Sequence, residues 1–164
     1  MKAARGWLPF LLALLMLAAS PAAQAQKGAK FQASAIQVLY VKSEEVRLPP
    51  EFQAALYENL VEEVKKTQRF PRVLRDGERG ATEIRDLIIL RSAVRGFRQG
   101  SAMVRQVTTI AGATKITVRV QMATRDGRLI LDEDVEGNVR FFGENLRATH
   151  DFAKQVAKLI RQNF

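Results

Sequence analysis

The sequence predicts an α+β protein, a two-layer α/β sandwich in which a mixed sheet of about four to five strands carries two helices on one face. The first observation is the Asp126-Gly127 dipeptide between two segments of alternating apolar and polar residues, a pattern typical of a β-hairpin. The second is the helical spacing of apolar residues in 51–68 and 143–163. A sheet with one apolar face and two amphipathic helices bury one another's apolar surfaces, which accounts for the two layers.

Residues 1–25 have the composition of a signal peptide. Lys2 and Arg5 precede an apolar run at 7–19, and Ala23-Gln24-Ala25 supplies the small residues of a cleavage site. The apolar run is shorter than the ~20 residues that a membrane-spanning helix needs. We therefore expect residues 26–164 to form a single exported domain, most readily periplasmic, with secretion and an uncleaved membrane anchor as alternatives. After cleavage we expect at most peripheral contact with a membrane.

The first half of the exported domain predicts a strand, a helix and a short strand. Apolar residues fill both faces near the end of 31–41, which indicates a central strand. Two prolines at 49–50 then favour a helix start. The helix over 51–68 repeats an apolar residue at every fourth position, at Phe52, Leu56, Leu60 and Val64. Pro71 ends this helix, and residues 70–74 predict a short strand.

The second half predicts three longer strands and a closing helix. Residues 86–98 place Ile88, Leu90 and Val94 on one face. Residues 114–124 and 129–140 form the hairpin, and 99–113 is expected to be a loop or an irregular hairpin arm. The closing helix covers 143–163.

A two-residue hairpin loop at Asp126-Gly127 defines the register of the hairpin. Arg125 then faces Arg128, and the apolar pairs share one face while pairs of opposite charge share the other. The apolar pairs are Val118 with Val135 and Met122 with Leu131, and the outer pairs are Arg119 with Asp134, Thr117 with Glu136 and Gln121 with Asp132. Glu133, opposite Val120, falls on the apolar side and does not fit unless it lies beyond the edge of the helices.

The composition excludes several chemistries. The chain has no Cys, so thiol catalysis, disulfides and cysteine metal sites are excluded. Its single histidine, His150, has Asp151 as a neighbour, and adjacent residues do not face each other on a helix. The acids of the second hairpin strand (Asp132, Glu133, Asp134 and Glu136) are expected to form cross-strand ion pairs. We expect no catalytic residue, cofactor or metal site. A hydrolase using these carboxylates is the weakest alternative.

Basic residues outnumber acidic ones and give a formal net charge of +9. Strand alternation places Arg91, Arg95, Lys115 and Arg119 on the outer face of the sheet, with Phe97 at the edge of the stripe they form. Such a stripe predicts a binding site for an anionic ligand, for example a glycolipid headgroup or a polyanion. Aromatic residues are scarce there, so nucleic acid is not expected. A solvated face that aids solubility is the simpler interpretation.

Four phrases of the sequence resemble a family of bacterial envelope proteins grouped as a domain of unknown function. They are RFPRV at 69–73, VRGFRQG at 94–100, TRDGRLI at 124–130 and FAKQVAKLI at 152–160. The layout is similar to that of the amino-terminal domain of TolB and of the periplasmic part of the curli secretion channel. The resemblance implies an α/β fold, export and protein–protein contacts, and it supplies no catalytic residue. Many members carry a lipid-anchoring cysteine, which this chain lacks.

These observations predict an exported, non-catalytic protein of the cell envelope that acts as an adaptor or subunit through protein–protein contacts. Its expected partner is another envelope protein, and the contact surface is the outer sheet face or the segment 99–113. An anionic-ligand binding module is the alternative. The sequence does not indicate an oligomeric state.

Overall fold

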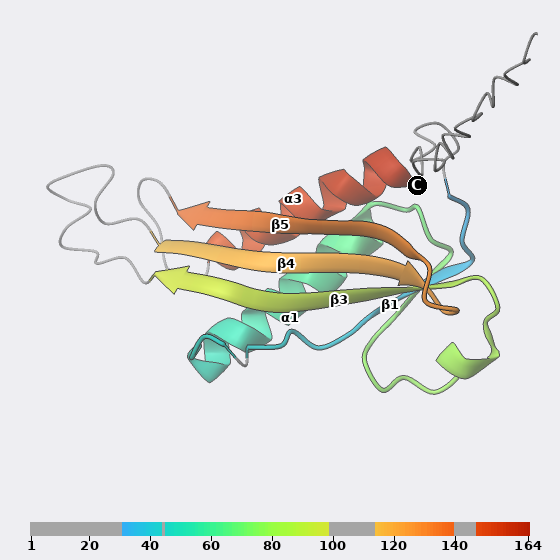
Figure 1. Ribbon diagram of the computed structural model, residues 1–164, viewed down its shortest axis with the longest axis horizontal. Coiled ribbons are helices and arrows are strands. Elements are labelled where there is room, and N and C mark those ends of the chain that lie inside the picture. The colour runs from blue at the N-terminus through green and yellow to red at the C-terminus, as the bar shows by residue number, and fades with distance from the viewer. Residues whose placement is uncertain (1–30, 44, 99–113, 140–146) are drawn as a thin grey trace, which may run out of the picture.

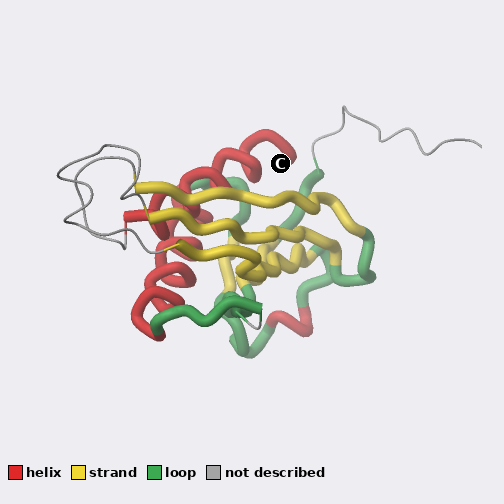
Figure 2. Tube along the Cα trace, turned by 60° about the vertical axis from the view of Figure 1, so that its left-hand side comes forward, coloured by secondary structure: helices red, strands yellow, loops and turns green. Residues whose placement is uncertain are grey.

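The computed structural model describes residues 31–43, 45–98, 114–139 and 147–164 (Figure 1). They form one mixed five-stranded sheet, and two long helices pack together on one side of it (Figure 2). The predicted fold class is therefore confirmed. The expected signal peptide, the segment 99–113 and the first residues of the predicted closing helix, 143–146, lie outside the described residues.

The strands lie in the order β2-β1-β3-β4-β5. Strand β1 runs parallel to β2 and β3, whereas β4 is antiparallel to both β3 and β5. The predicted central position of the first strand is thus confirmed. The elements are β1 (Ala35–Val38), α1 (Pro50–Lys66), β2 (Arg72–Leu74), the 3₁₀ helix η1 (Ala81–Glu83), β3 (Leu87–Arg98), β4 (Thr114–Thr124), β5 (Leu129–Val139) and α3 (Arg147–Asn163).

Helix α1 begins where the sequence favours it. Pro50 occupies the first turn, where a missing N–H costs nothing, and Glu51 and Lys66 lie at the ends that suit their charges. Helix α3 packs beside α1, and the Nδ2 of Asn59 donates a hydrogen bond of 2.7 Å to the Oγ1 of Thr149 between them. Both amphipathic helices are thus covered on their apolar faces.

The core lies between the helices and the inner face of the sheet. The predicted face of β3 is confirmed, because Ile88, Leu90 and Val94 are all buried. The largest fully buried side chains come from both helices and from strands β1, β3 and β4, among them Phe152, Ile36, Leu56, Leu60, Ile88, Leu90, Ile116, Met122 and Ile160. Within the described ranges, no helix is both long and apolar enough to cross a bilayer.

The predicted register of the β4–β5 hairpin is confirmed, but its turn differs. All the predicted pairs from Thr117 to Met122 are observed. The turn is one residue longer, because the Thr124 N–H donates to the Arg128 carbonyl at 2.9 Å and Gly127 adopts a left-handed φ of 91°. A register shift between Met122 and Ala123 absorbs the extra residue. The expected Arg125–Arg128 pairing is therefore wrong, whereas the pairs beyond the shift are unaffected.

A β-bulge in β3 changes the outer face near its end. Val94 pairs with Val118 but Gly96 pairs with Thr117, so Arg95 is the extra residue. From there on the alternation is inverted. Phe97 consequently faces the core, with its ring centroid 4.8 Å from that of Phe52. The expectation that Phe97 edges the basic stripe on the outer face is wrong for this reason.

The loop between β2 and β3 covers one end of the outer sheet face. A small second core forms there from Ala35, Leu74, Ala81 and Leu87. The guanidinium of Arg125 holds the loop in place by donating to the carbonyls of residues 82 and 84, at 2.5 and 3.1 Å. The remaining outer face, over the middle of β3, β4 and β5, is left without such a cover among the described residues.

Candidate functional site

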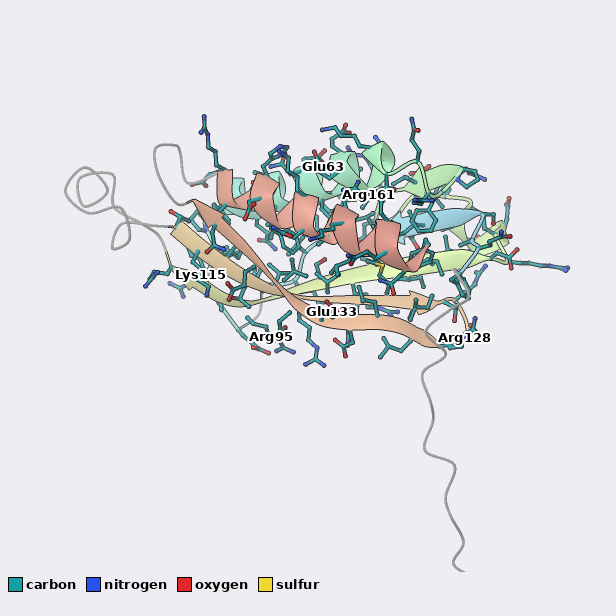
Figure 3. All side chains as sticks on the ribbon, turned by 90° about the horizontal axis from the view of Figure 1, so that it is seen from above. Glu63, Arg95, Lys115, Arg128, Glu133 and Arg161 are labelled. Atoms are coloured by element: carbon teal, nitrogen blue, oxygen red, sulfur yellow. The ribbon has the colours of Figure 1, made fainter. Side chains whose placement is uncertain are left out.

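The predicted basic residues lie on the outer face of the sheet, on the side opposite the helices. In Figure 3, Arg95 and Lys115 point away from the helical layer that carries Glu63 and Arg161. The register sets Arg119 of β4 beside Ala93 of β3, two residues along the strand from Arg91 and on the same face. The antiparallel pairing of β3 and β4 therefore brings the two halves of the predicted stripe together.

Three of the four predicted residues line one hollow of about 330 Å³ on this face. Lys115 is not part of it; its Nζ lies 2.6 Å from the Oε1 of Glu136. The hollow is lined by Leu39, Tyr40, Lys42, Arg91, Ser92, Ala93, Arg95, Arg119 and Gln121.

An irregular pairing of β1 with β3 opens the hollow. Val38 pairs with Leu90, but the next bridge joins Lys42 to Ala93, so the β1 side has one residue more than the β3 side. The Lys42 N–H donates to the Ser92 carbonyl at 2.9 Å and closes the irregularity. Because the extra chain bulges outward, it forms one wall of the hollow.

Two of the arginines are held by acids. Both Nε and Nη2 of Arg119 donate to the Asp132 carboxylate at 2.7 Å, and Gln121 donates to the same carboxylate at 3.0 Å. The hydrogen bonds from Arg119 lower the pKa of Asp132 to about 2. Arg95 forms an ion pair with Glu45. The direct Arg119–Asp134 pair expected from the register is therefore replaced by a diagonal pair, since the long side chain reaches the next outward position of β5.

Arg91 differs from these neighbours. Its side chain is exposed, and among the described residues it has neither an ion-pair partner nor a hydrogen-bond partner. Arg98 is also exposed, and the register places it opposite Lys115. Strand alternation alone assigns Arg98 to the inner face, so the sequence analysis missed it; the glycine at 96, which permits the bulge, was the available signal.

Tyr40 is the second residue that the sequence analysis did not assign to this site. It is 43% exposed at the wall of the hollow, although its ring lies 5.0 Å from that of Tyr57. Its backbone is fixed, because its N–H donates to Asp76 at 2.9 Å. The apolar run of 31–41 predicted a buried strand here and gave no sign of the bulge.

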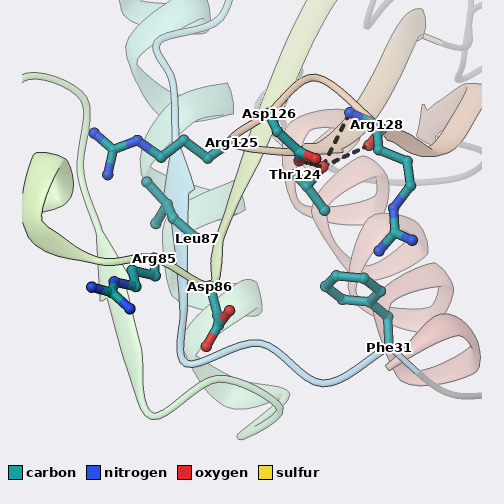
Figure 4. Close-up of a pocket in the computed structure, with 8 residues that line it drawn as sticks. All are labelled: Phe31, Arg85, Asp86, Leu87, Thr124, Arg125, Asp126 and Arg128. Atoms are coloured by element: carbon teal, nitrogen blue, oxygen red, sulfur yellow. Dashed lines mark hydrogen bonds between the residues drawn. The ribbon is translucent and has the colours of Figure 1, made fainter.

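A larger hollow of about 580 Å³ lies at the turn end of the β4–β5 hairpin (Figure 4). Its charged residues already make structural contacts. Arg125 holds the loop before β3, and the Arg128 guanidinium lies 5.0 Å from the centre of the Phe31 ring. Asp126 accepts a hydrogen bond from Thr124, which lowers its pKa. This hollow therefore has fewer groups available to a ligand than the one beside Arg91.

The other polar residues considered in the sequence have structural contacts. His150 is partly exposed, with Nε2 4.0 Å from Glu63, and Asp151 accepts a hydrogen bond from the Asn138 N–H at 3.0 Å. Glu133 is exposed on the edge strand beside α3, which explains its place on an otherwise apolar face. In the part of the chain that the structure describes, no group of three or more His, Cys, Asp or Glu side chains is placed to hold a metal ion.

No family model and no curated protein matches the chain. Among solved structures, it is similar to PelC from Paraburkholderia phytofirmans, crystallised as a dodecamer, with a TM-score of 0.60, 12% identity, and 82% of this chain and 93% of that chain covered. A point variant of that PelC gives a TM-score of 0.59 at 10% identity, with 82% of this chain and 92% of the variant's chain covered. A hypothetical protein from Chlamydia trachomatis gives a TM-score of 0.48 at 11% identity, with 77% of this chain and 93% of that chain covered.

At these identities the likeness to PelC shows a shared fold and no more. It extends over nearly the whole PelC chain, so the fold is shared as a complete unit. These matches do not include TolB or the curli channel, and the layout resemblance to those two proteins stays a prediction.

Proposed function

We propose that the chain is an exported, non-catalytic subunit of a cell-envelope assembly, and that it acts through protein–protein contacts, including contacts between its own copies. The observation that carries this proposal is the fold shared over 93% of PelC, a protein crystallised as a dodecamer. Export rests on the signal-peptide pattern of residues 1–25.

The sheet provides a surface suited to such contacts. Strand β5 is an edge strand of 11 residues, and no described strand pairs with its outer side. An edge strand offers unpaired backbone groups to another chain, and charged side chains restrict which chain is accepted. The exposed acids Glu133 and Asp134 give this edge a negative charge, whereas the charge of Glu136 is balanced by Lys115. A complementary basic surface on a neighbouring subunit fits it.

Native electrophoresis of a mild detergent extract of the envelope tests this proposal. We expect the protein in a discrete complex much larger than the 18.4 kDa chain. Glu133→Lys on the β5 edge should shift it to smaller species. Glu83→Lys, which makes the same change at another exposed glutamate, on η1, is the matched control and should have no effect. A wild-type protein that migrates only as a single chain, or equal effects of the two variants, would contradict the proposal.

The non-catalytic part of the proposal is supported by the state of the carboxylates. Asp132 and Glu136 are both in ion pairs with cations of β4, so neither is poised as a general acid or base. The alternative, a carboxylate-dependent hydrolase, is tested with ester, phosphoester and glycoside substrates. Turnover by the purified protein that is abolished in Asp132→Asn would overturn the non-catalytic assignment.

The outer face supports a second candidate function, a binding module for an anionic ligand. The specific observation is that Arg91 and Arg98 have no acidic partner among the described residues, although their neighbours do. Binding of the polyanion heparin should weaken steeply with salt, because exposed charges are screened. Replacing Arg91, Arg95, Lys115 and Arg119 together by Gln should abolish it. Unchanged heparin binding in this fourfold variant would remove the candidate.

A further inference from the structure

We propose that the hollow beside Arg91 is a binding site for a phosphate monoester, the group shared by a phosphorylated lipid headgroup and a small phosphorylated metabolite. The inference rests on the second candidate function, anionic-ligand binding at the outer face. It narrows that function to one place and one chemical class.

Three arginines on neighbouring strands line the hollow, together with Lys42. Two of them are balanced by acids, Arg95 by Glu45 and Arg119 by Asp132, which leaves Arg91 as the uncompensated guanidinium. An uncompensated guanidinium attracts an anion with an oxygen pair that matches its fork of donors. Among the three guanidiniums, the uncompensated charge is therefore located at Arg91.

The paired arginines still have N–H groups to donate. Each guanidinium carries five donors, and Arg119 uses Nε and Nη2 on Asp132 while Arg95 uses Nη1 on Glu45. Their acids also hold these side chains in place, so little additional side-chain entropy is lost when a ligand binds. The hollow thus presents one uncompensated guanidinium and two oriented ones around a common space.

The number of oxygens separates the possible anions. A carboxylate has two oxygens, and a single arginine fork engages both of them at once. A phosphate monoester has three terminal oxygens in a tetrahedral arrangement, so it can accept from Arg91 and from its neighbours at once. Three arginines around one hollow therefore favour the monoester over a carboxylate or a phosphate diester, which has only two terminal oxygens.

The remaining walls suit the uncharged part of such a ligand. Ala93 lies between the arginines and leaves room above the sheet, and Leu39 and the exposed ring of Tyr40 form an apolar side. The volume of about 330 Å³ exceeds what a phosphate group fills, so the group bearing the phosphate also has space.

The test is an amide NMR titration of the purified exported protein at constant ionic strength. The probes are inorganic phosphate, glycerol 3-phosphate and acetate. Saturable shifts of the amides of Arg91, Ala93 and Gln121 with both phosphates, but not with acetate, are expected. Arg91→Gln should weaken glycerol 3-phosphate binding about tenfold or more, because a hydrogen-bonded charge pair is lost. Arg91→Lys, which keeps the charge but loses the fork, should be intermediate.

Arg161→Gln, an exposed change on α3 on the helical side, is the control and should bind as the wild type. Equal saturation by acetate, or unchanged binding in Arg91→Gln, would overturn the phosphate site. If heparin still binds in a salt-dependent way, the second candidate function survives that result. If heparin also fails to bind, both are wrong.

Vesicles separate the two sources of the monoester. Phosphatidylcholine vesicles containing phosphatidic acid present a monoester, and vesicles containing phosphatidylglycerol at matched surface charge present a diester. Binding to phosphatidic acid alone identifies a lipid source, and binding to glycerol 3-phosphate without vesicle binding identifies a soluble one; both support the site. Equal binding to the two kinds of vesicle would overturn the monoester assignment.

Discussion

At Gly137, helix α3 approaches the sheet too closely to leave space for a Cβ atom. A Cβ at this residue would lie 2.2 Å from the Ala148 carbonyl oxygen and 2.8 Å from the Phe152 Cβ. Neither is the far end of a flexible side chain, so no rotamer change relieves the contact. Gly137→Ala therefore pushes α3 away from β5 by roughly 1 Å, against close packing on both sides.

The expected cost is at the upper end of what overpacking produces, about 3 kcal/mol of the free energy of unfolding. The matched control is Gly96→Ala in β3, where the new Cβ would meet Thr117 at an ordinary 3.8 Å. Neither glycine has a positive φ, so the two variants differ mainly in available space. The control should change stability by less than about 0.5 kcal/mol.

Urea denaturation followed by circular dichroism measures both variants. The only tryptophan is Trp7, within the expected signal peptide, so tryptophan fluorescence is not a suitable probe. All proteins are compared at one concentration, because self-association raises apparent stability. A Gly137→Ala variant within about 0.5 kcal/mol of Gly96→Ala would refute the close approach of α3 to β5.

Two further substitutions test the sheet. Ser92 is 2% exposed, and its hydroxyl has no hydrogen-bond partner among the described residues; Ser92→Ala should therefore raise the free energy of unfolding by about 1 kcal/mol in the same assay, and a loss of stability would contradict this. Arg119 lowers the pKa of Asp132 to about 2. The ionised Asp132 therefore contributes its full stabilisation of the folded state above the ordinary aspartate pKa of about 4, and this stabilisation is lost as the pH falls toward 2. Asp132→Asn should flatten the decline of stability over this range, and an unchanged pH profile would show that the Arg119–Asp132 pair does not stabilise the folded state.

Most of the fold followed from patterns that depend only on local sequence. Helix α1 and the β4–β5 register were predictable because amphipathic spacing and cross-strand charge pairing each constrain many residues together. The extra turn residue at Asp126-Gly127 was not predictable, but the shift after Met122 compensated for it. Several cross-strand pairs define the register together, so the predicted pairs remained correct although the predicted turn length was wrong.

The candidate site was predicted only in part, because two irregularities in strand pairing determine which side chains line it. Alternation correctly placed Arg91, Arg95 and Arg119 on one face, and β3 and β4 are indeed neighbours. The bulge at Arg95 moved Phe97 to the core and Arg98 outward, and the irregular end of β1 placed Tyr40 at the hollow. Such one-residue insertions depend on pairing with a distant strand, so the local pattern does not reveal them.

The ion pairs of the site were also predicted only in part from the sequence. The sequence predicted that acids of β5 face bases of β4, and they do. It did not predict that Arg119 reaches Asp132 instead of Asp134, because side-chain length and the diagonal geometry of the sheet decide between two acids of the same face. Arg91 has no acidic partner among the described residues, and this is the basis for the proposed phosphate site.

The oligomeric state of the purified protein, residues 26–164, tests the central proposal most directly. Sedimentation velocity across a range of micromolar concentrations, with native mass spectrometry to count the chains, should give one discrete assembly of several subunits. Glu133→Lys should shift it toward smaller species, and Glu83→Lys should leave it intact. A protein that remains a single chain at every concentration, in solution and in the envelope extract, would contradict the proposed role as a subunit that contacts its own copies.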